Sequence, residues 1–397
     1  MPSRLITNQT DFLALCEHIR HSPEVAFDTE FVSESYYRPR LCLIQLATEE
    51  QVFAVDPLEV TDLSAWWQIM TEGKVNVIVH GGREEIRFCL THTGQPPAKF
   101  VDVQIAEGLL SHGYPIGYET LVQRVLGEQL PGGQSRTEWQ RRPLSKPQLD
   151  YALEDVRHLL NVWKRQQVSL EKKGRRAWAE VEFLRLIQDE IKARQGELWR
   201  KIPGSGRLSR RELGILRELF LWRDAFAQRV NRPARVTFRD DLLIEVAKRR
   251  PKSLHDLNLT RGMQRNEYQK VADEILQAVQ TGMQIPDEEL PEKPPHLANE
   301  PRDEILTRIL ALALADRCSG LGISQSLVGS SADLHDIIRW HVHDGRGSEL
   351  PRLLQGWRAE VCGEFLTDLL DGKISLRVID PQKSQPLRFE KLPPKGS

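Results

Sequence analysis

The chain has 397 residues, 40% of them hydrophobic and 28% charged, with a formal net charge of −1 at pH 7. This length predicts two or three domains. No apolar run reaches the roughly 18 to 20 residues that cross a membrane, and the N-terminus lacks the apolar core of a signal peptide. The five cysteines are scattered and never paired as C-x-x-C, which argues against a disulfide framework or a zinc site and predicts a cytoplasmic protein.

The first part of the chain shows alternating strand and helix patterns. Closely spaced strands favour antiparallel pairing, and they are expected at 25–31, 41–47 and 51–55. Two later strands, at 75–80 and 99–103, alternate with helices. Helices are expected at 11–20, 63–70 and 83–90, and in a segment that ends near 110. The expected fold is a mixed sheet with helices on both faces.

A loop rich in Gly, Pro and Arg follows at 127–145. A long helix is expected at 146–170, with Pro147 near its first turn. A second helix, at 180–201, is expected to connect this domain to the next one.

A linker at 202–206 precedes a segment with helical patterns and no strand pattern, at 209–230, 240–248, 253–259 and 266–280. Residues 205–283 contain 16 basic and 10 acidic residues. This mild basic excess suits contacts with a phosphate backbone. An ordinary solvated helix bundle would explain the same charge equally well.

A second linker, rich in proline and acidic residues, leads to another helical segment at 305–370. Residues 300–376 contain 8 basic and 12 acidic residues, so this module resembles its neighbour in size and helix content but not in charge. The proline-containing tail at 377–397 is expected to be disordered.

Two pairs of residues suggest chemistry. Asp28 and Glu30 lie two positions apart on a predicted strand and therefore on one face, where buried like charges need compensation such as a divalent cation. A solvated strand end would also explain this pair. Tyr151 and Asp155 share a helix face at i and i+4, where a phenol could orient the attacking water beside a metal-binding carboxylate. That second pair is weak by itself, because many helices contain one like it.

Three motifs, in order along the chain, carry a family resemblance: VAFDTEF at 25–31, HGGREEI at 80–86 and LDYALEDVRHLL at 149–160. They resemble ribonuclease D, in the tyrosine-bearing branch of the DEDD superfamily of 3′→5′ exonucleases. LCLIQL at 41–46, DVQ at 102–104 and WQRRPL at 139–144 also look like family sequence. The two helical segments resemble the HRDC domains of this family, the second being the more divergent.

The resemblance covers nearly the whole chain and implies a domain order. A ribonuclease H-like exonuclease domain with its connecting helix would occupy 1–201, followed by an HRDC domain at 205–283. A linker at 284–300 would precede a second HRDC-like domain at 301–376 and the tail at 377–397.

The resemblance also implies the activity: a metal-dependent 3′→5′ exoribonuclease that releases nucleoside 5′-monophosphates and acts in the 3′ processing of tRNA or other small stable RNA. Two Mg²⁺ or Mn²⁺ ions would be the cofactors, because hard oxygen ligands suit these cations. Asp28, Glu30, Glu85 and Asp155 would be the ligands, and Tyr151 would position the attacking water. The expected partner is a structured RNA with a single-stranded 3′ end. The protein is expected to be a monomer and not to bind a membrane.

Glu85 departs from the family pattern, which has Asp at this position. The extra methylene must be accommodated, and displacements near 1 Å can cost about 10²-fold in rate. Glu84 or Asp102 could be the ligand instead, although a helix N-cap explains Asp102 plainly. Two alternatives stay open: the same chemistry on DNA, or a nucleic-acid-binding scaffold with an impaired site.

Four further residues are candidates for substrate contact: His80, Arg136, Arg141 and Arg142. A hydrogen-bonded core histidine is an equally good explanation for His80. The arginines could instead cap helices or pair with nearby acids. Trp139, among these arginines, is expected to be core packing.

Overall fold

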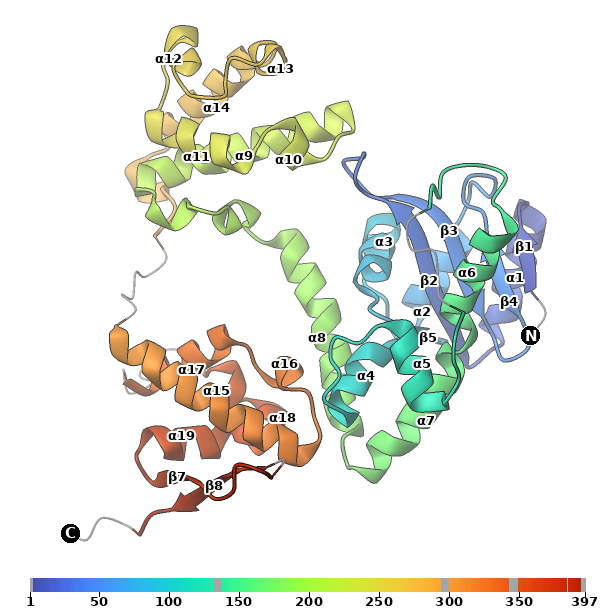
Figure 1. Ribbon diagram of the computed structural model, residues 1–397. Coiled ribbons are helices and arrows are strands. Elements are labelled where there is room, and N and C mark those ends of the chain that lie inside the picture. Colours follow the sequence, from blue (N-terminus) through green and yellow to red (C-terminus); the bar gives the residue numbers. More distant parts are fainter. Residues whose placement is uncertain (1–2, 132–136, 294–299, 343–348, 384, 394–397) are drawn as a thin grey trace.

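The computed structural model describes residues 3–131, 137–293, 300–342, 349–383 and 385–393. The first part of the chain forms an α/β domain, the long helix α8 (Arg176–Gln195) leads away from it, and two helical modules follow (Figure 1). Among these residues no helix is both long and apolar enough to span a bilayer.

A six-stranded mixed sheet forms the α/β domain. Its spatial order is β1 (Ser3–Ile6), β4 (Val52–Val55), β3 (Arg40–Ala47), β2 (Glu24–Val32), β5 (Asn76–Val79) and β6 (Phe100–Asp102). Strands β2, β3 and β4 pair antiparallel, whereas β1 with β4, β2 with β5 and β5 with β6 pair parallel. The expected mixed sheet is confirmed. Strand β1 was not predicted, because it is short and three of its four residues are exposed.

Helices cover the central strand β2 on both faces (Figure 1). On one face, Phe27 packs edge-on against Trp66 of α2 (Ser64–Glu72), with ring centroids 4.8 Å apart, and Phe31 meets Phe88 of α3 (Arg83–Thr93). Helix α1 (Gln9–Arg20) packs beside α2. Helices α6 (Lys146–Arg157) and α7 (Leu159–Lys172) contact β2 from the other face. Alternate residues of β2 therefore face two different environments.

The single long helix expected at 146–170 is wrong, because α6 and α7 are separate. The Tyr118 hydroxyl donates to the Glu154 carbonyl at 2.9 Å and accepts from the His158 backbone N–H at 3.3 Å. These two backbone groups would bond to each other in a continuous helix, so the phenol interrupts the helix there. Tyr118 begins α5 (Tyr118–Leu126), which follows α4 (Val103–Leu110).

The first helical module has a hydrophobic core of its own, separate from that of the α/β domain. The helix expected at 180–201 ends at Gln195, and a 3-10 turn at Leu198–Lys201 follows it. The module then contains α9 (Arg210–Val230), α10 (Ala234–Thr237), α11 (Asp240–Arg249), α12 (Leu254–Asn258), α13 (Asn266–Gln269) and α14 (Ala272–Gln284).

The second helical module shares one continuous core with the α/β domain. Trp357 stacks on Trp178 of α8 with ring centroids 5.1 Å apart. Its helices are α15 (Pro301–Leu321), α16 (Gln325–Val328), α17 (Ser331–Val342), α18 (Gly356–Arg358) and α19 (Glu364–Leu370). A π-helical turn at Ala359–Gly363 joins the last two.

The prediction of a disordered tail is wrong for most of that segment. Strands β7 (Ile374–Val378) and β8 (Leu387–Lys391) form an antiparallel hairpin, and Phe389 packs edge-on against Phe365 at 5.0 Å. Pro381 and Pro386 lie between the two strands, where they interrupt no strand pairing. Residues 384 and 394–397 lie outside the described residues.

Candidate active site

Strand β2 carries two of the predicted site residues. Asp28 lies opposite Gln45 of β3, and Glu30 lies opposite Leu43, so both acids face the layer of α6 and α7. The register of the pair shifts directly after Glu30. Such bulges bend a strand and re-aim side chains next to active sites.

Helix α6 brings Tyr151 and Asp155 to the same place. A capping box between Ser145 and Gln148 fixes the start of this helix. A hydrogen bond from the Tyr151 hydroxyl lowers the pKa of Asp155 from the value that burial would give it. The Tyr151 ring packs near Trp139, which is only 5% exposed, so the prediction that Trp139 is core packing is confirmed.

Burial raises the pKa values of the clustered carboxylates, and neighbouring acids add to the shift. Burial raises the pKa of Asp28 well above its ordinary value, and the charges of Glu85, Asp155 and Glu30 add to this shift. Burial, with the charges of Asp155 and Glu85, raises the pKa of Glu30 to about 8. Burial also raises the pKa of Asp155 to about 7. Nearby uncompensated carboxylates behave in this way, and a bound cation would reverse the shift.

Glu85, and not Glu84, joins this cluster. Glu85 lies in the first turn of α3, is 5% exposed and accepts a 2.6 Å hydrogen bond from the Thr29 hydroxyl. Burial raises the pKa of Glu85 to about 7, and the hydrogen bond from Thr29 opposes this shift. Glu84 is half-buried and pairs with Arg87 instead. The longer Glu side chain is thus held against β2 by the residue between the two strand acids.

Asp102 has a structural role. It caps α4 by accepting from the Gln104 N–H at 2.9 Å, and it also accepts from the N–H groups of Gly81 and Gly82. A Cβ on Gly82 would lie 2.4 Å from the Val79 side chain, so only glycine fits this close turn. Asp102 therefore fixes the turn from which α3 and Glu85 start.

His80 is a half-buried residue whose ring is hydrogen-bonded within the protein. Its Nε2 lies 2.9 Å from the Ile116 carbonyl, and burial lowers the pKa of its imidazole. The ring also packs edge-on near Tyr118 at 5.7 Å. These contacts fit the structural explanation of His80 better than a role in substrate binding.

The three arginines differ. All N–H groups of Arg142 that could hold a phosphate are engaged: Arg142 pairs with Asp56 and donates to the carbonyls of Cys42, Trp139 and Arg141. These contacts favour the structural explanation of Arg142, which ties the loop to the sheet. Arg141 is exposed. Arg136 lies outside the described residues.

The donor set fits a hard divalent cation. It consists of four buried or half-buried carboxylates whose pKa values are raised, and oxygen donors of this kind suit Mg²⁺ or Mn²⁺. Over the described part of the chain, no three His, Cys, Asp or Glu side chains are already arranged as a formed cation site.

Sequence reasoning gave no role to two polar residues of the strands, Thr29 and Gln45. Thr29 holds Glu85, as described above. Gln45 is fully buried opposite Asp28, and neither polar atom of its amide has a hydrogen-bond partner among the residues that the structure describes. An unpaired buried amide costs about 1–3 kcal/mol. Both residues could have been identified from the sequence, because each is a polar residue inside an otherwise apolar strand.

Comparisons with known proteins agree with this architecture. Residues 3–171 match a family model described as 3′-5′ exonuclease, 212–279 match the HRDC domain, and 308–366 match the C-terminal HRDC domain of ribonuclease D. The chain is 32% identical to a ribonuclease D of Bartonella henselae, over 94% of this chain and 91% of the relative. It is 34% identical to one of Gluconacetobacter diazotrophicus, over 94% of each.

The whole structure is also similar to a solved one. The crystal structure of Escherichia coli RNase D, described as an exoribonuclease involved in structured RNA processing, superimposes with a TM-score of 0.82 at 29% identity. The match covers 94% of this chain and 99% of that chain. An exonuclease fold with a mixed sheet, two HRDC modules and relatives of nearly equal length agree on one conclusion: the chain belongs to the ribonuclease D family of 3′→5′ exoribonucleases.

Proposed function

We propose that Asp28, Glu30, Glu85 and Asp155 bind two divalent cations, Mg²⁺ or Mn²⁺, at which RNA is hydrolysed from its 3′ end. The observation that carries this assignment is the convergence of four buried or half-buried carboxylates from β2, α3 and α6, with Glu85 held at 2.6 Å by Thr29 of β2 and with the charges of Glu85 and Asp155 adding to the raised pKa values of Asp28 and Glu30. Protein interiors do not keep such acids together without a compensating charge. When bound, the cations would stabilise the charge that develops on the attacked phosphate and on the leaving oxygen.

Tyr151 would hold the attacking water in this proposal. Burial, followed by the charges of Asp155, Glu30 and Asp28, raises the pKa of the Tyr151 phenol. The phenol therefore stays protonated near neutral pH and is suited to a hydrogen bond, not to removing a proton from water. Its neighbours Trp139 and Asp155 fix the ring and the hydroxyl.

The products would be nucleoside 5′-monophosphates, and the substrates tRNA precursors or other small stable RNAs with a single-stranded 3′ end. The description of the E. coli relative as a processor of structured RNA supports this class of substrate. The names of the relatives favour RNA over DNA. The basic first HRDC module would hold the body of the RNA. A monomeric, cytoplasmic enzyme stays a prediction.

Replacing Asp28 by Asn tests the site. The Asp28→Asn variant should lose at least about 10³-fold in the rate of mononucleotide release from a labelled RNA in Mg²⁺, since it removes a ligand charge worth several kcal/mol. It should unfold at a midpoint equal to or above that of the wild type, because it relieves repulsion. If the variant hydrolyses RNA at the wild-type rate, the assignment is refuted. If the wild-type enzyme cleaves a DNA strand of the same sequence faster than the RNA, the choice of RNA is refuted.

A further inference from the structure

A cleft of about 1190 Å³ lies between the exonuclease domain and the first HRDC module. Its walls come from the β2–β3 connection at 33–39, from α3, from the C-terminal end of α8 and from α10. Figure 1 shows the β2–β3 connection reaching toward α10. The connection begins at Ser33, directly after β2, the strand that carries Asp28 and Glu30. The cleft is therefore joined to the catalytic strand by a few residues of chain.

The walls of this interdomain cleft carry an excess of positive charge. Arg38, Arg40 and Arg194 are exposed along it, and none of them forms an ion pair with a residue that the structure describes. The two acids of the walls are already compensated: Glu84 pairs with Arg87, and Glu190 pairs with Arg83 and Arg87. An anionic ligand would thus meet three guanidinium groups without displacing an acid.

Two tyrosines of the connection lie among these arginines. The Arg38 guanidinium is 5.9 Å from the Tyr37 ring centre, and that of Arg40 is 5.9 Å from the Tyr36 ring centre. The Tyr36 hydroxyl donates to Gln140 at 3.1 Å, in the loop before α6. The Tyr37 hydroxyl donates to Asp224 of α9 at 2.7 Å. Both rings are held at the hydroxyl end, on the two sides of the connection.

We propose that the interdomain cleft binds a single-stranded RNA segment, with Arg38, Arg40 and Arg194 on its phosphates and the rings of Tyr36 and Tyr37 on its bases. Arginines beside aromatic faces are the usual means of holding a single strand without reading its sequence. The choice of RNA rests on the proposed function, because the same molecule would present its 3′ end to Asp28. The cleft would hold nucleotides upstream of that end.

Fluorescence anisotropy with 5′-labelled RNA strands of 4 and 16 nucleotides tests the cleft, in EDTA so that no strand is cleaved. The triple variant Arg38→Ala, Arg40→Ala, Arg194→Ala should bind the 16-mer at least about 10-fold more weakly. Loss of three phosphate contacts should lower the slope of log affinity against log salt by about 2. Hydrolysis of the 4-mer in Mg²⁺ should stay within about twofold of the wild type.

A charge-matched control carries Arg302→Ala, Arg308→Ala and Arg377→Ala, in exposed positions of α15 and β7. Replacing Tyr37 by Leu should weaken 16-mer binding at least about fivefold through lost stacking, whereas Tyr37→Phe, which keeps the ring and loses only the bond to Asp224, should weaken it less. Unchanged 16-mer affinity in the triple variant, or equal loss in the control, overturns the proposal. Because binding is measured in EDTA, this result is independent of whether Asp28→Asn abolishes hydrolysis.

A second inference comes from Gln45. In an antiparallel pair, directly opposed residues project on the same face, so the Gln45 amide lies on the face of Asp28, in the layer of α6. It is 0% exposed, and both of its polar atoms lack a partner within the described structure. Buried amides in native proteins are almost always paired, so an unpaired one beside a reactive carboxylate calls for a partner.

We infer that Gln45 is a positioning residue, whose side-chain N–H donates to the Asp28 carboxylate once that carboxylate holds a cation. This inference rests on the proposed function, since it needs the cation. A hydrogen bond to an ionised acceptor is short and directional, so it would fix the orientation of the carboxylate. Asp28 would then be held in one orientation by Gln45 from the neighbouring strand.

Replacing Gln45 by Met tests this role, because Met has nearly the same volume and no polar group. If the Gln45 amide has only a structural role, the Gln45→Met variant should be more stable than the wild type and should keep its function. A positioning amide predicts Mn²⁺ binding at least about 10-fold weaker by calorimetry, and a lower kcat with unchanged KM for RNA. Wild-type Mn²⁺ affinity in Gln45→Met overturns the inference. If Asp28→Asn also binds Mn²⁺ like the wild type, the failure lies in the proposed function instead.

Discussion

Two clusters of buried acids in this molecule behave in opposite ways. The catalytic cluster on β2, α3 and α6 contains Asp28, Glu30, Glu85 and Asp155, and all four have raised pKa values. The second cluster lies on α8, where Glu182 is fully buried and has a lowered pKa. Burial alone would raise the pKa of Glu182, but the hydrogen bonds and charge of Arg358 outweigh it.

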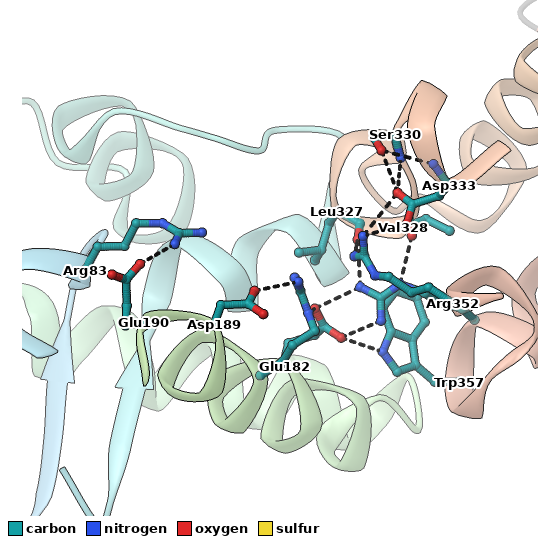
Figure 2. A network of polar contacts seen from close by, with 12 residues as sticks. Arg83, Glu182, Asp189, Glu190, Leu327, Val328, Ser330, Asp333, Arg352 and Trp357 are labelled. Carbon is teal, nitrogen blue, oxygen red and sulfur yellow. Dashed lines mark hydrogen bonds and ion pairs between the residues drawn. The ribbon is translucent and has the colours of Figure 1, made fainter. Parts of the chain in front are cut away.

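The α8 network owes this difference to its partners (Figure 2). Glu182 accepts from the Arg358 guanidinium at 2.6 and 2.9 Å and from the Trp357 indole N–H at 2.9 Å. Arg358 in turn donates to the carbonyls of Leu327 and Val328. Further along α8, Glu190 binds Arg83 and Arg87 of α3, the helix that carries Glu85. Every charge of this network is compensated by protein.

The contrast indicates which buried acids are free for chemistry. The α8 acids join domains, because their charge is already used by arginines. Among the described residues, the acids of the catalytic cluster have no ion pair with an arginine or lysine, and their hydrogen bonds come from a hydroxyl, a phenol and backbone N–H groups. An uncompensated cluster weakens the fold and is kept where a ligand supplies the missing charge.

Among the variants that distinguish the catalytic cluster from the α8 network, Glu85→Gln should have the largest effect. We expect at least about a 10²-fold loss in the rate of RNA hydrolysis, because the variant removes a ligand charge while keeping the side-chain length. Its stability should be unchanged or higher. The rate of mononucleotide release in Mg²⁺ and the urea midpoint check this.

The neighbouring Glu84→Gln variant is the matched control for Glu85→Gln. Glu84 pairs with Arg87 at the surface, so its replacement should leave the rate within about twofold and the stability within about 0.5 kcal/mol. A large loss of activity in Glu84→Gln alone would show that the wrong glutamate has been assigned to the catalytic cluster.

Replacing Glu182 by Gln should, in contrast to Glu85→Gln, lower the stability of the protein. It leaves Arg358, 4% exposed, without its counter-charge, and breaking such a buried pair costs about 3–5 kcal/mol. Urea denaturation measures the loss. The double variant Glu182→Leu, Arg358→Met should regain much of this stability, because it removes both charges. A loss below about 1 kcal/mol in Glu182→Gln would mean that the pair does not hold the second module.

Much of the catalytic cluster could be predicted from local sequence. Asp28 and Glu30 share a face because strand residues alternate, and Tyr151 and Asp155 share one because helices repeat every 3.6 residues. The mixed sheet followed from strand spacing in the same way. Asp102 as a helix cap was also readable from its position before a helix. These features depend on residues only a few positions apart.

Features that depend on distant partners could not be predicted. The end of α6 is set by Tyr118, 36 residues before the carbonyl that it binds, and Arg142 is taken up by Asp56, 86 residues away. The Glu182–Arg358 pair spans 176 residues. The charge count of the second module gave no sign that its buried arginine joins the exonuclease core. The proline-containing composition of the tail likewise gave no indication that Phe389 packs on Phe365.

The two clusters should also differ in how they make stability depend on pH. Between about pH 5 and 8, the catalytic cluster should change the free energy of unfolding by about 1–3 kcal/mol, and the α8 network should not change it. A carboxyl with a raised pKa binds its proton more tightly in the folded state, so metal-free stability should fall as the pH rises from about 5 to 8. Glu182 has a lowered pKa, so its contribution to stability is constant across that range and is lost only at lower pH. Thermal unfolding in EDTA measures this slope, and Asp28→Asn should flatten it.

Added Mg²⁺ should therefore raise the unfolding temperature more at pH 8 than at pH 5.5, because the ligands must be deprotonated to bind it. Glu182→Gln should keep this difference, since its network takes no part in binding the cation. An equal Mg²⁺ effect at both pH values would contradict the assignment of the raised pKa values to a cation site.

The smallest effect is expected at the rim of the α8 network, where Arg185 pairs with Glu182 at 2.8 Å and with Asp189 at 3.0 Å. Its side chain is 33% exposed, so water can replace much of what it contributes to Glu182. Arg185→Ala should cost less than about 1 kcal/mol in urea denaturation. Arg358→Ala, on the buried side of the same carboxylate, should cost several times more. If the two variants are equally destabilised, compensation of Glu182 comes from the whole set of charges around it, and burial of one arginine is not what distinguishes the α8 network from the catalytic cluster.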